Sequence, residues 1–462
     1  MTAPSPLRLR VAARASPLSR AQTDEALHLL RGALPAGTAF EVFHLDTPGD
    51  RDKHTPLSDP SVPDDFFTRD LDTLVQNGDC DLAVHSAKDL PKRMPRGLAV
   101  AAILPCLDPR DALVLRAGVA TPADARSVGT SSPRRDAAVR AMSPHAQPRP
   151  LRGTIDERIA ALDGGGFDAI VVAACALERL GLAARIAAYL PGETTPLQGH
   201  LALVTRADDG SLIEELRPLD FRLRLFDAPP VDPPTPAPGP VTSETALFLG
   251  THPGHFVHLG PLLPWPMIRL DPRPLEERTA LIGRHLDGCA SVAFASAFAA
   301  QAFVHALLHA RDTRALSGRS LFAVGPATAD ALERLGLHAD AVVPDFSGIA
   351  SLAPRAAAVV RGRCFYPCSS ASPSDDRVRT LAAHGIDLVP AIFYETTEAC
   401  PGPLPDGPFG RVFFTSPSTV RSYFRHYPAE RTAARRWLAI GPSTLAALQA
   451  ERLDPGAVEM LG

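Results

Sequence analysis

The sequence predicts an α/β protein built from two modules, and three features of the chain lead to this prediction. Strand-like and helix-like segments alternate along the first half, which is typical of layered α/β domains. A proline-rich stretch then interrupts the chain, and in the second half one strand–turn–helix unit occurs twice. The proline stretch marks the boundary between the two modules.

In the first half, the expected elements follow one another as strand, helix and strand. Residues 7–13 are predicted to form a strand, 19–31 a helix and 82–85 a buried strand. Residues 168–173 are expected to form a further strand, followed by a helix that ends at Leu182.

Between residues 128 and 135 the sequence Val-Gly-Thr-Ser-Ser-Pro-Arg-Arg predicts a strand end, a glycine turn and a helix start. Ser131 or Ser132 would cap this helix, and Pro133 would be its first residue. The segment 151–158, Leu-Arg-Gly-Thr-Ile-Asp-Glu-Arg, repeats the plan. The start of a helix attracts anions, because free N–H groups and a partial positive charge lie there.

Four arginines accompany these two turns. Guanidinium groups bind carboxylates through two hydrogen bonds at once. The sequence therefore predicts a site for a ligand with several carboxylates, unless these side chains are solvated charges on helix surfaces. The four are Arg134, Arg135, Arg152 and Arg158.

Seven of the thirteen residues 228–240 are proline, so this stretch is predicted to be an extended polyproline spacer of about 40 Å. In the second half, residues 292–303 resemble 412–423, and 322–332 resemble 438–448. Two such lobes facing each other would form a cleft lined by helix N-termini and hydroxyl groups. Alternatively, the Ser, Gly and Thr residues of these turns serve only as helix caps.

Composition excludes several classes of function. The formal net charge of −4 over 462 residues argues against nucleic acid as a partner. No stretch approaches 18 apolar residues and no signal peptide is evident, so we expect no membrane span and a cytoplasmic location. The seven cysteines show no CxxC spacing, which predicts neither a zinc site nor a disulfide framework.

The first half resembles porphobilinogen deaminase, also called hydroxymethylbilane synthase, over about residues 7–210. The resemblance starts from Asp81-Leu-Ala-Val-His-Ser-Ala-Lys-Asp-Leu-Pro. The other matching motifs are Val11-Ala-Ala-Arg-Ala-Ser-Pro, Asp108-Pro-Arg-Asp-Ala, Val128-Gly-Thr-Ser-Ser-Pro-Arg-Arg, Leu151-Arg-Gly and Leu177-Glu-Arg-Leu-Gly-Leu. The second half resembles uroporphyrinogen-III synthase through Thr415-Ser-Pro-Ser-Thr-Val and its two Gly-Pro turns.

These resemblances imply two bilobal α/β modules joined by a Pro-rich linker. The first would have lobes like those of periplasmic binding proteins, over residues 5–227. The linker would span 228–243, and a two-lobed synthase-like module would span 244–462. The two families catalyse consecutive steps of tetrapyrrole (haem) biosynthesis.

The resemblance to deaminases implies that Asp89 is the catalytic carboxylate, which steadies the azafulvenium cation formed when ammonia leaves. Lys88 would help to keep Asp89 ionised. His85 precedes this loop and is either structural or part of the site. The residues expected to hold the carboxylates of the growing chain are Arg14, Ser16, Ser131, Arg134, Arg135, Arg152, Arg158 and Arg179.

The resemblance to the synthase implies that the second module closes a linear tetrapyrrole mainly by holding it in a folded shape. Tyr394 matches a proposed proton donor, although it could equally be an ordinary strand tyrosine. The residues expected to contact substrate are Ser296, Gly325, Thr415, Ser416, Ser418 and Gly441. No metal is expected in either module.

The sequence departs from the deaminase pattern at the cofactor. The family carries a dipyrromethane primer on a cysteine of a third domain, in a Gly-Gly-Cys-x-x-Pro context. No cysteine of this chain has that context, and the third domain is missing between residue 209 and the linker. The loop before Phe66 and the segment 195–201, Thr-Pro-Leu-Gln-Gly-His-Leu, also differ from the family.

Three functions therefore remain open. The chain polymerises porphobilinogen and cyclises the resulting linear tetrapyrrole to uroporphyrinogen III. Alternatively, only the second half is catalytic and the first is a tetrapyrrole-binding module, or the whole chain is a non-catalytic ligand-binding protein. A separate protein that supplies the missing domain is a possible partner.

Overall fold

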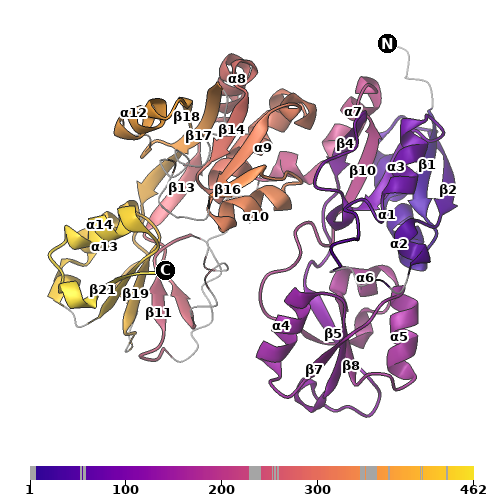
Figure 1. The fold of residues 1–462 in the computed structure, drawn as a ribbon, viewed down its shortest axis with the longest axis horizontal. Helices are drawn as coiled ribbons and strands as arrows, with labels where there is room; N and C mark the ends of the chain where they lie inside the picture. The colour runs from indigo at the N-terminus through magenta and orange to yellow at the C-terminus, as the bar shows by residue number, and fades with distance from the viewer. Residues whose placement is uncertain are drawn as a thin grey trace. The chain divides into compact units, whose positions relative to one another are not determined.

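The computed structural model describes residues 7–52, 55, 59–227, 241–251, 253, 256, 260–343, 349, 362–372, 375–405, 407, 409–432 and 435–461. The chain divides into two compact units, Met1–Leu223 and Arg224–Gly462, and each consists of two α/β lobes (Figure 1). Residues 228–240 of the predicted linker lie outside the described residues. None of the helices described is long and apolar enough to cross a membrane.

Lobe A of the first unit is built on a five-stranded sheet with the order β2-β1-β3-β10-β4. The strands are β1 (Arg8–Arg14), β2 (Ala39–Leu45), β3 (Leu82–Ser86), β4 (Leu98–Ile103) and β10 (Leu201–Arg206). The strands β1, β2 and β3 run parallel, whereas β10 returns from the other lobe and pairs antiparallel with β3 and β4. The helices are α1 (Pro17–Ala33), α2 (Pro48–Arg51), α3 (Arg69–Gln76) and α7 (Gly210–Leu216).

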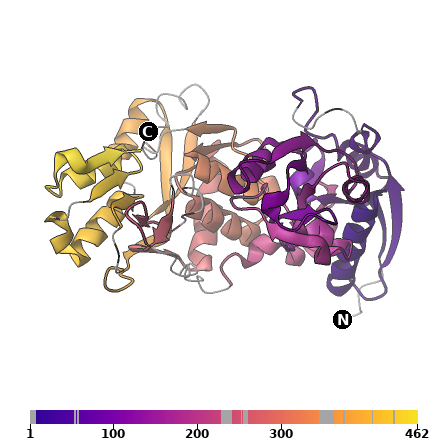
Figure 2. The ribbon, with the colours of Figure 1, turned by 90° about the horizontal axis from the view of Figure 1, so that it is seen from below.

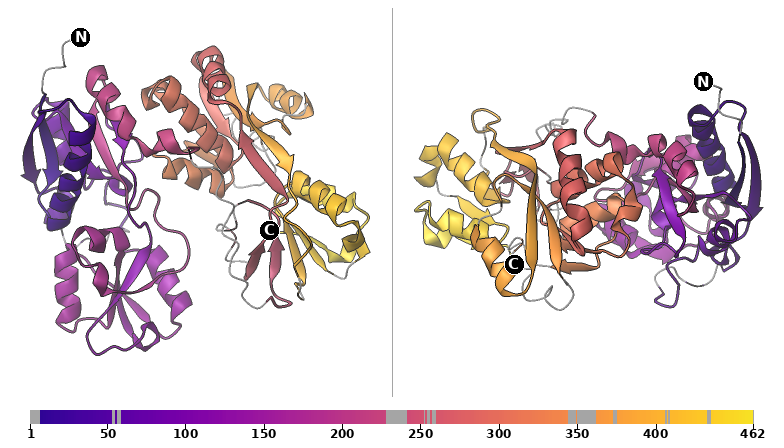
Figure 3. Two further views of the ribbon diagram at one scale, coloured as in Figure 1. Left: turned by 180° about the vertical axis from the view of Figure 1, so that it is seen from behind. Right: turned by 90° about the horizontal axis from the view of Figure 1, so that it is seen from above.

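Lobe B of the same unit has a sheet with the order β7-β6-β8-β5-β9. Its strands are β5 (Asp111–Leu115), β6 (Ser127–Thr130), β7 (Gln147–Pro150), β8 (Ala169–Ala173) and β9 (Ile186–Tyr189). Its helices are α4 (Pro133–Met142), α5 (Ile155–Asp163) and α6 (Ala174–Arg179). The helices α4 and α5 lie on opposite sides of the sheet (Figure 3). The chain therefore crosses between lobes A and B twice, after β4 and after β9.

Lobe C of the second unit combines segments from its two ends in a parallel sheet with the order β12-β11-β19-β20-β21. Its strands are β11 (Ala246–Phe248), β12 (Leu262–Pro264), β19 (Arg411–Phe414), β20 (Arg436–Ala439) and β21 (Val458–Met460). The helices α13 (Pro417–His426) and α14 (Pro442–Gln449) lie side by side beside it (Figures 1 and 2).

Lobe D is inserted between β12 and β19 and has the order β13-β18-β17-β14-β15-β16. Its strands are β13 (Ile268–Pro272), β14 (Ser291–Phe294), β15 (Ser320–Val324), β16 (Ala341–Val343), β17 (Arg363–Ser369) and β18 (Asp387–Glu398). Its helices are α8 (Leu275–His285), α9 (Ala297–Ala310), α10 (Pro326–Arg334) and α12 (Asp375–Ala383). The edge strand β13 alone pairs antiparallel, with β18.

The predicted strand-to-helix turns are confirmed. Ser132 caps α4 by accepting a hydrogen bond from the N–H of Arg135, and Pro133 is the first residue of that helix. The repeated unit of the second half forms β14 with α9 and β19 with α13, which begin after the caps Ser296 and Ser416. A helix after residue 173 was also expected, but its predicted end at Leu182 is wrong, since α6 stops at Arg179. The nearby Gly181 has φ +70°, a backbone conformation that ends helices.

Candidate functional site

A cavity lies between lobes A and B, and we refer to it as the first cavity. Its lining comes from the ends of β1 and β3, the starts of α1 and α5, and the turns before α4 and α6. Of the residues that the sequence assigns to this site, Arg14, Ser16, Lys88, Asp89, Ser131, Arg135, Arg152 and Arg158 line it. Residues that belong to separate sequence motifs thus line one cavity.

Arg14 stands at the end of β1 and is held from two sides. Its guanidinium donates hydrogen bonds to both carboxylate oxygens of Asp50, with Nε 2.9 Å from Oδ2, and it lies 4.6 Å from the ring centroid of Phe67. Burial lowers the pKa of Arg14, but the hydrogen bond to Asp50 and the charge of Asp89 outweigh it, so that the pKa lies above its ordinary value. Arg14 therefore remains a fixed cation in the cavity.

Asp89 ends the short helix η1 (Ala87–Asp89), which follows β3 directly. Its Oδ2 lies 3.9 Å from Nη1 of Arg14, within ion-pair distance. The neighbouring Lys88 instead directs its Nζ to Oε1 of Gln198, at 3.2 Å. Burial lowers the pKa of Lys88, and Asp89 opposes this effect while Arg135 adds to it.

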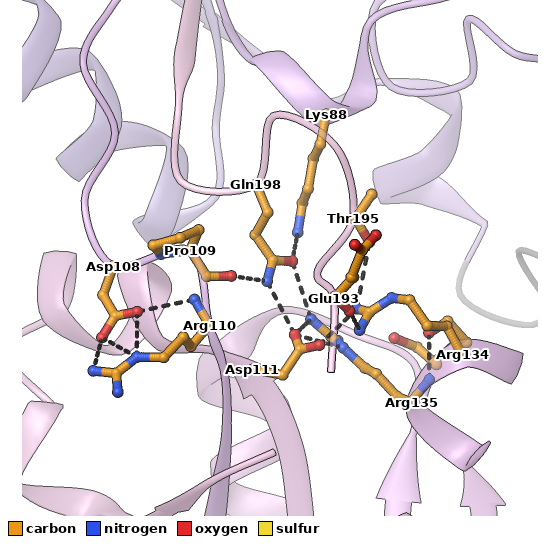
Figure 4. Close-up of polar contacts among 12 residues, drawn as sticks. Lys88, Asp108, Pro109, Arg110, Asp111, Arg134, Arg135, Glu193, Thr195 and Gln198 are labelled. Carbon is orange, nitrogen blue, oxygen red and sulfur yellow. Dashed lines mark hydrogen bonds and ion pairs between the residues drawn. The ribbon is translucent and has the colours of Figure 1, made fainter. Parts of the chain in front are cut away.

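Gln198 connects lobes A and B through its hydrogen bonds to Lys88 and to Arg135 and Asp111 (Figure 4). Its Oε1 accepts hydrogen bonds from Lys88 of lobe A and Arg135 of lobe B. Its Nε2 donates to the carbonyl of Pro109, at 2.7 Å, and to Oδ1 of Asp111, at 3.0 Å. The amide orientation is therefore fixed by two cations on one side and two oxygens on the other.

Asp111, the first residue of β5, is the buried anion of this network. Nη2 of Arg135 lies 2.8 Å from its Oδ1, and Nη2 of Arg134 lies 2.6 Å from its Oδ2. Burial alone would raise the pKa of Asp111, but Arg135, Gln198 and Arg134 together lower it below its usual value. Arg134 also donates to the carbonyl of Glu193 at 2.8 Å, and it does not line the cavity.

Arg152 and Arg158 differ from these paired arginines, because neither has a carboxylate within ion-pair distance among the described residues. Arg152 donates to the carbonyl of Asp52 at 2.7 Å, and its buried Nε has no hydrogen-bond partner among the described residues. Arg158 donates to the carbonyl of Gly153 at 2.9 Å and weakly to the hydroxyl of Ser131 at 3.4 Å. Burial and the nearby Arg135 and Arg152 lower the pKa of Arg158 to about 10.

Two further residues of the sequence prediction take other positions. Arg179 at the end of α6 pairs with Glu25 of α1, with Nε 2.6 Å from Oε2, and so joins lobe B to lobe A without lining the cavity. His85 lies 3.0 Å from Asp72 in the interior of lobe A, where both side chains are buried. The structure thus gives His85 the position of a structural residue.

A second cavity lies between lobes C and D of the second unit. It is lined by Ser296 and Ala299 of the α9 start, Thr415, Ser416 and Pro417 of the α13 start, and Ser443 and Thr444 of α14. Tyr366, Cys368, Ser369, Ser372 and Tyr394 contribute from β17 and β18 and their flanks. Three helix N-termini and many hydroxyl groups therefore converge there, as the repeat predicts.

Tyr394 is a buried residue of β18. Its phenol lies 2.9 Å from the hydroxyl of Ser296, the cap of α9. Burial raises the pKa of Tyr394 to about 12, although the hydrogen bond with Ser296 acts in the other direction. The phenol is therefore protonated at neutral pH, and Tyr394 lines the second cavity.

The remaining predicted contacts of this module do not line the second cavity. Gly325 begins α10 in lobe D, and Gly441 begins α14 two residues before Ser443, which does line it. The hydroxyl of Ser418 accepts a hydrogen bond from Arg421 at 3.3 Å on the surface of α13.

All seven cysteines lie among the described residues, and none of them lines the first cavity. In the first unit, burial raises the pKa of Cys80, Cys106 and Cys175. Within the described part of the chain, no group of three or more His, Cys, Asp or Glu residues is placed to hold a metal ion.

Sequence reasoning missed four residues that organise the first cavity: Asp50, Phe67, Asp111 and Gln198. Asp50 had a local signal, because Thr47-Pro48-Gly49-Asp50 is a helix start in which Thr47 and Asp50 cap each other. Gln198 had no local sequence signal, because its partner Lys88 is 110 residues away in the chain.

Comparison with known families gives one match for each unit. Residues 9–214 match the family model described as porphobilinogen deaminase, dipyromethane cofactor binding domain. Residues 262–459 match that described as uroporphyrinogen-III synthase HemD. The cofactor expected from the sequence is thus named in the description of the first match.

Two relatives agree with the first match, and a solved structure was compared with the second. A probable porphobilinogen deaminase of Chlamydia muridarum is 44% identical over 200 residues, which cover 43% of this chain and 81% of the relative. Porphobilinogen deaminase of Bordetella parapertussis is 42% identical over 199 residues, and this chain spans only 63% of its length. A crystal structure of mutant uroporphyrinogen III synthase from Thermus thermophilus covers 46% of this chain and 92% of its own, at 19% identity and a TM-score of 0.34.

Proposed function

Because the chain belongs to the porphobilinogen deaminase family in its first half and carries a uroporphyrinogen-III synthase domain in its second, we propose that it makes uroporphyrinogen III from porphobilinogen. The first unit would join porphobilinogen units into hydroxymethylbilane, and the second would close this linear tetrapyrrole. Both steps belong to tetrapyrrole biosynthesis, which is the pathway of both families.

One observation carries this proposal for the first unit: an interlobe cavity where Asp89 lies beside Arg14, and which is also lined by two arginines that no carboxylate of the described residues pairs with. Arg152 and Arg158 are half-buried cations whose charges a carboxylated ligand would neutralise. Asp89 is an anion fixed next to the space where a cationic intermediate would form, which favours electrostatic stabilisation of that charge. Arg135, which lines the cavity, would add a further cation.

For the second unit, the proposal rests on Tyr394 and the helix N-termini of the second cavity. A protonated phenol can give a proton to a leaving hydroxyl group as a ring closes. The caps Ser296 and Ser416 and the first turns of α9, α13 and α14 present N–H and O–H donors to the carboxylates of the substrate. Holding the tetrapyrrole folded would supply the remaining rate enhancement.

The cofactor fits the first cavity only in part. The cations of the cavity suit a dipyrromethane with its acidic side chains. No cysteine lines the cavity, however, and a thioether requires a reactive thiolate. We therefore infer that this chain holds the primer by ionic contacts or receives it from a separate protein, and that its attachment cysteine is absent.

The test is to incubate the purified chain with porphobilinogen, oxidise the products and separate the uroporphyrin isomers. Isomer III is expected from the wild-type chain, isomer I from Tyr394→Phe, and no porphyrin from Asp89→Asn. If the wild-type chain forms no porphyrin even with a dipyrromethane primer added, the deaminase proposal fails. The first unit would then be a binding module, and hydroxymethylbilane would be the substrate to offer the second unit.

The mass of the denatured chain tests the inference about the primer. A mass equal to that of the sequence, together with a rate that rises when primer is added, is expected for a reversibly bound primer. A mass increased by a dipyrromethane, mapped to a peptide containing Cys106 or Cys175, would contradict it.

A further inference from the structure

The segment Arg224–Asp227 is the first part of the second unit, and it lies outside residues 262–459, which match the synthase family. Its aromatic residue, Phe226, is half-buried against lobe D. The ring centroid of Phe226 lies 5.5 Å from that of Phe298 and 5.1 Å from that of His305, both in edge-to-face geometry. Phe298 and His305 are seven residues apart on α9, so they lie on one face of that helix two turns apart.

A buried cation fixes the other side of this ring. The guanidinium of Arg278 on α8 lies 5.4 Å from the ring centroid of Phe226. Its hydrogen bonds go to the carbonyls of Arg273 and Ala302, at 2.8 and 2.9 Å, and it contacts His305 at 3.3 Å. No carboxylate within the described residues pairs with Arg278, so the face of the Phe226 ring supplies part of the negative potential that this cation needs.

Phe298 also packs against Tyr394, which lines the second cavity. Its ring packs edge-to-face against Tyr394, with 4.9 Å between the centroids. It stands in the first turn of α9, two residues after Ser296, whose hydroxyl binds the phenol of Tyr394. Phe226, Phe298 and Tyr394 therefore form a continuous row of rings that runs from the entering segment to the cavity.

We propose that Phe226 is a positioning residue for Tyr394, and that it acts through Phe298. It holds Phe298 and the first turn of α9 in place, so that the Tyr394 ring and its hydrogen bond with Ser296 keep one orientation toward the substrate. The chain that leaves the first unit thus completes the active site of the second. The proposal rests on the role of Tyr394 proposed above.

The test uses the full chain with Phe226→Ala and, as rescue, Phe226→Trp. Edge-to-face ring contacts are worth enough to change a rate several-fold, so we expect kcat for hydroxymethylbilane closure to fall roughly three- to tenfold with KM unchanged. Phe226→Trp should restore kcat, because it returns an aromatic ring to this position. The matched control is Phe256→Ala, which removes another half-buried ring of this unit, one that packs on Phe413 and not on Tyr394.

Two readouts separate positioning from general destabilisation. In a double-mutant cycle, Phe226→Ala and Phe298→Ala should be non-additive in their effects on kcat, and additive effects would overturn the proposal. The chain has five tyrosines, so fluorotyrosine labelling gives few ¹⁹F lines, and Tyr394→Phe identifies the one from Tyr394. Phe226→Ala should shift that line, whereas Phe256→Ala should not.

An unshifted Tyr394 line would overturn the positioning role even if activity fell. If the wild-type chain does not turn over hydroxymethylbilane, the proposed function of the second unit fails. The ¹⁹F line then still decides whether Phe226 orients Tyr394.

Discussion

The hydroxyl of Ser296 and the phenol of Tyr394, 98 residues apart in the chain, lie 2.9 Å from each other at the second cavity. Ser296 caps the start of α9 and Tyr394 belongs to β18, the longest strand of the same lobe, so the fold alone brings them together. Both are parts of lobe D. Their hydrogen bond directs the phenol into the cavity between lobes C and D.

Tyr394→Phe should lower kcat for closure of hydroxymethylbilane about 100-fold, because general acid catalysis contributes that order of rate. Ser296→Ala should lower it less, since the phenol keeps its proton and loses only its orientation. Rates measured with hydroxymethylbilane as the added substrate would check this. Equal loss in both variants would show that Ser296 itself contacts the reacting atoms.

Asp89→Asn should lower the rate of porphobilinogen consumption about 100-fold or more, because a fixed anion beside the developing cation is lost. The matched control is Asp163→Asn, which neutralises a surface carboxylate paired with Arg185. Consumption of porphobilinogen with time is the measurement. An unchanged rate in Asp89→Asn would remove the role that we give this residue.

Arg152→Gln should mainly weaken ligand binding, whereas Arg179→Gln should mainly lower the stability of the fold. Removing Arg152 eliminates a cation that no carboxylate in the described ranges pairs with, so we expect affinity for hydroxymethylbilane to fall about tenfold while the free energy of unfolding hardly changes. Removing Arg179 leaves Glu25 unpaired and should cost about 2 kcal/mol of that free energy. Titration calorimetry and urea unfolding of each variant measure the two quantities.

Binding of a carboxylated ligand to the first cavity should weaken at high pH. The pKa of Arg158 is about 10 in the free protein, and a bound carboxylate would raise it. Binding near pH 10 should therefore take up a proton, and affinity should fall as the pH rises above that value. Arg158→Gln should remove this part of the pH dependence, and a wild-type profile that stays flat to pH 11 would contradict the prediction.

Gly199 lies where the returning chain passes the first crossover between lobes A and B. It has φ +93°, and a Cβ atom there would lie 2.9 Å from the carbonyl oxygen of Leu107. Gly199→Ala should therefore cost about 1–3 kcal/mol in the free energy of unfolding. Gly192→Ala is the control, because Gly192 has a similar φ of +94° but open space around it. Similar losses in both variants would mean that backbone strain alone, and not the contact between crossovers, sets the cost.

Local signals explain which parts of the fold and the site could be predicted. The start of α4 follows from Ser132 and Pro133, which are neighbours in the sequence, and the cap residues of α9 and α13 follow in the same way. The end of α6 was placed too late, because the apolar pattern continues past Arg179, and only Gly181 shows where the helix stops.

The separate roles of the arginines could not be predicted, since they depend on contacts between distant segments. Arg134 and Arg152 each lie beside a glycine-containing turn that leads into a helix, and nothing local in the sequence separates their roles. In the structure, Arg134 is paired with the buried Asp111, whereas Nε of Arg152, which lines the first cavity, has no partner in the described part of the chain. The two side chains are chemically identical. Arg134 is paired because β5 places Asp111 beside it.

The two cavities present very different surfaces to the same acidic molecule. Formal charges line the first, whereas hydroxyl groups and helix N-termini line the second among the described residues. Dissolved salt weakens attraction between full charges far more than it weakens short, directed hydrogen bonds. Under the proposed function, raising the ionic strength should therefore release the linear tetrapyrrole from the first cavity sooner than from the second, so that salt would set the direction of its transfer.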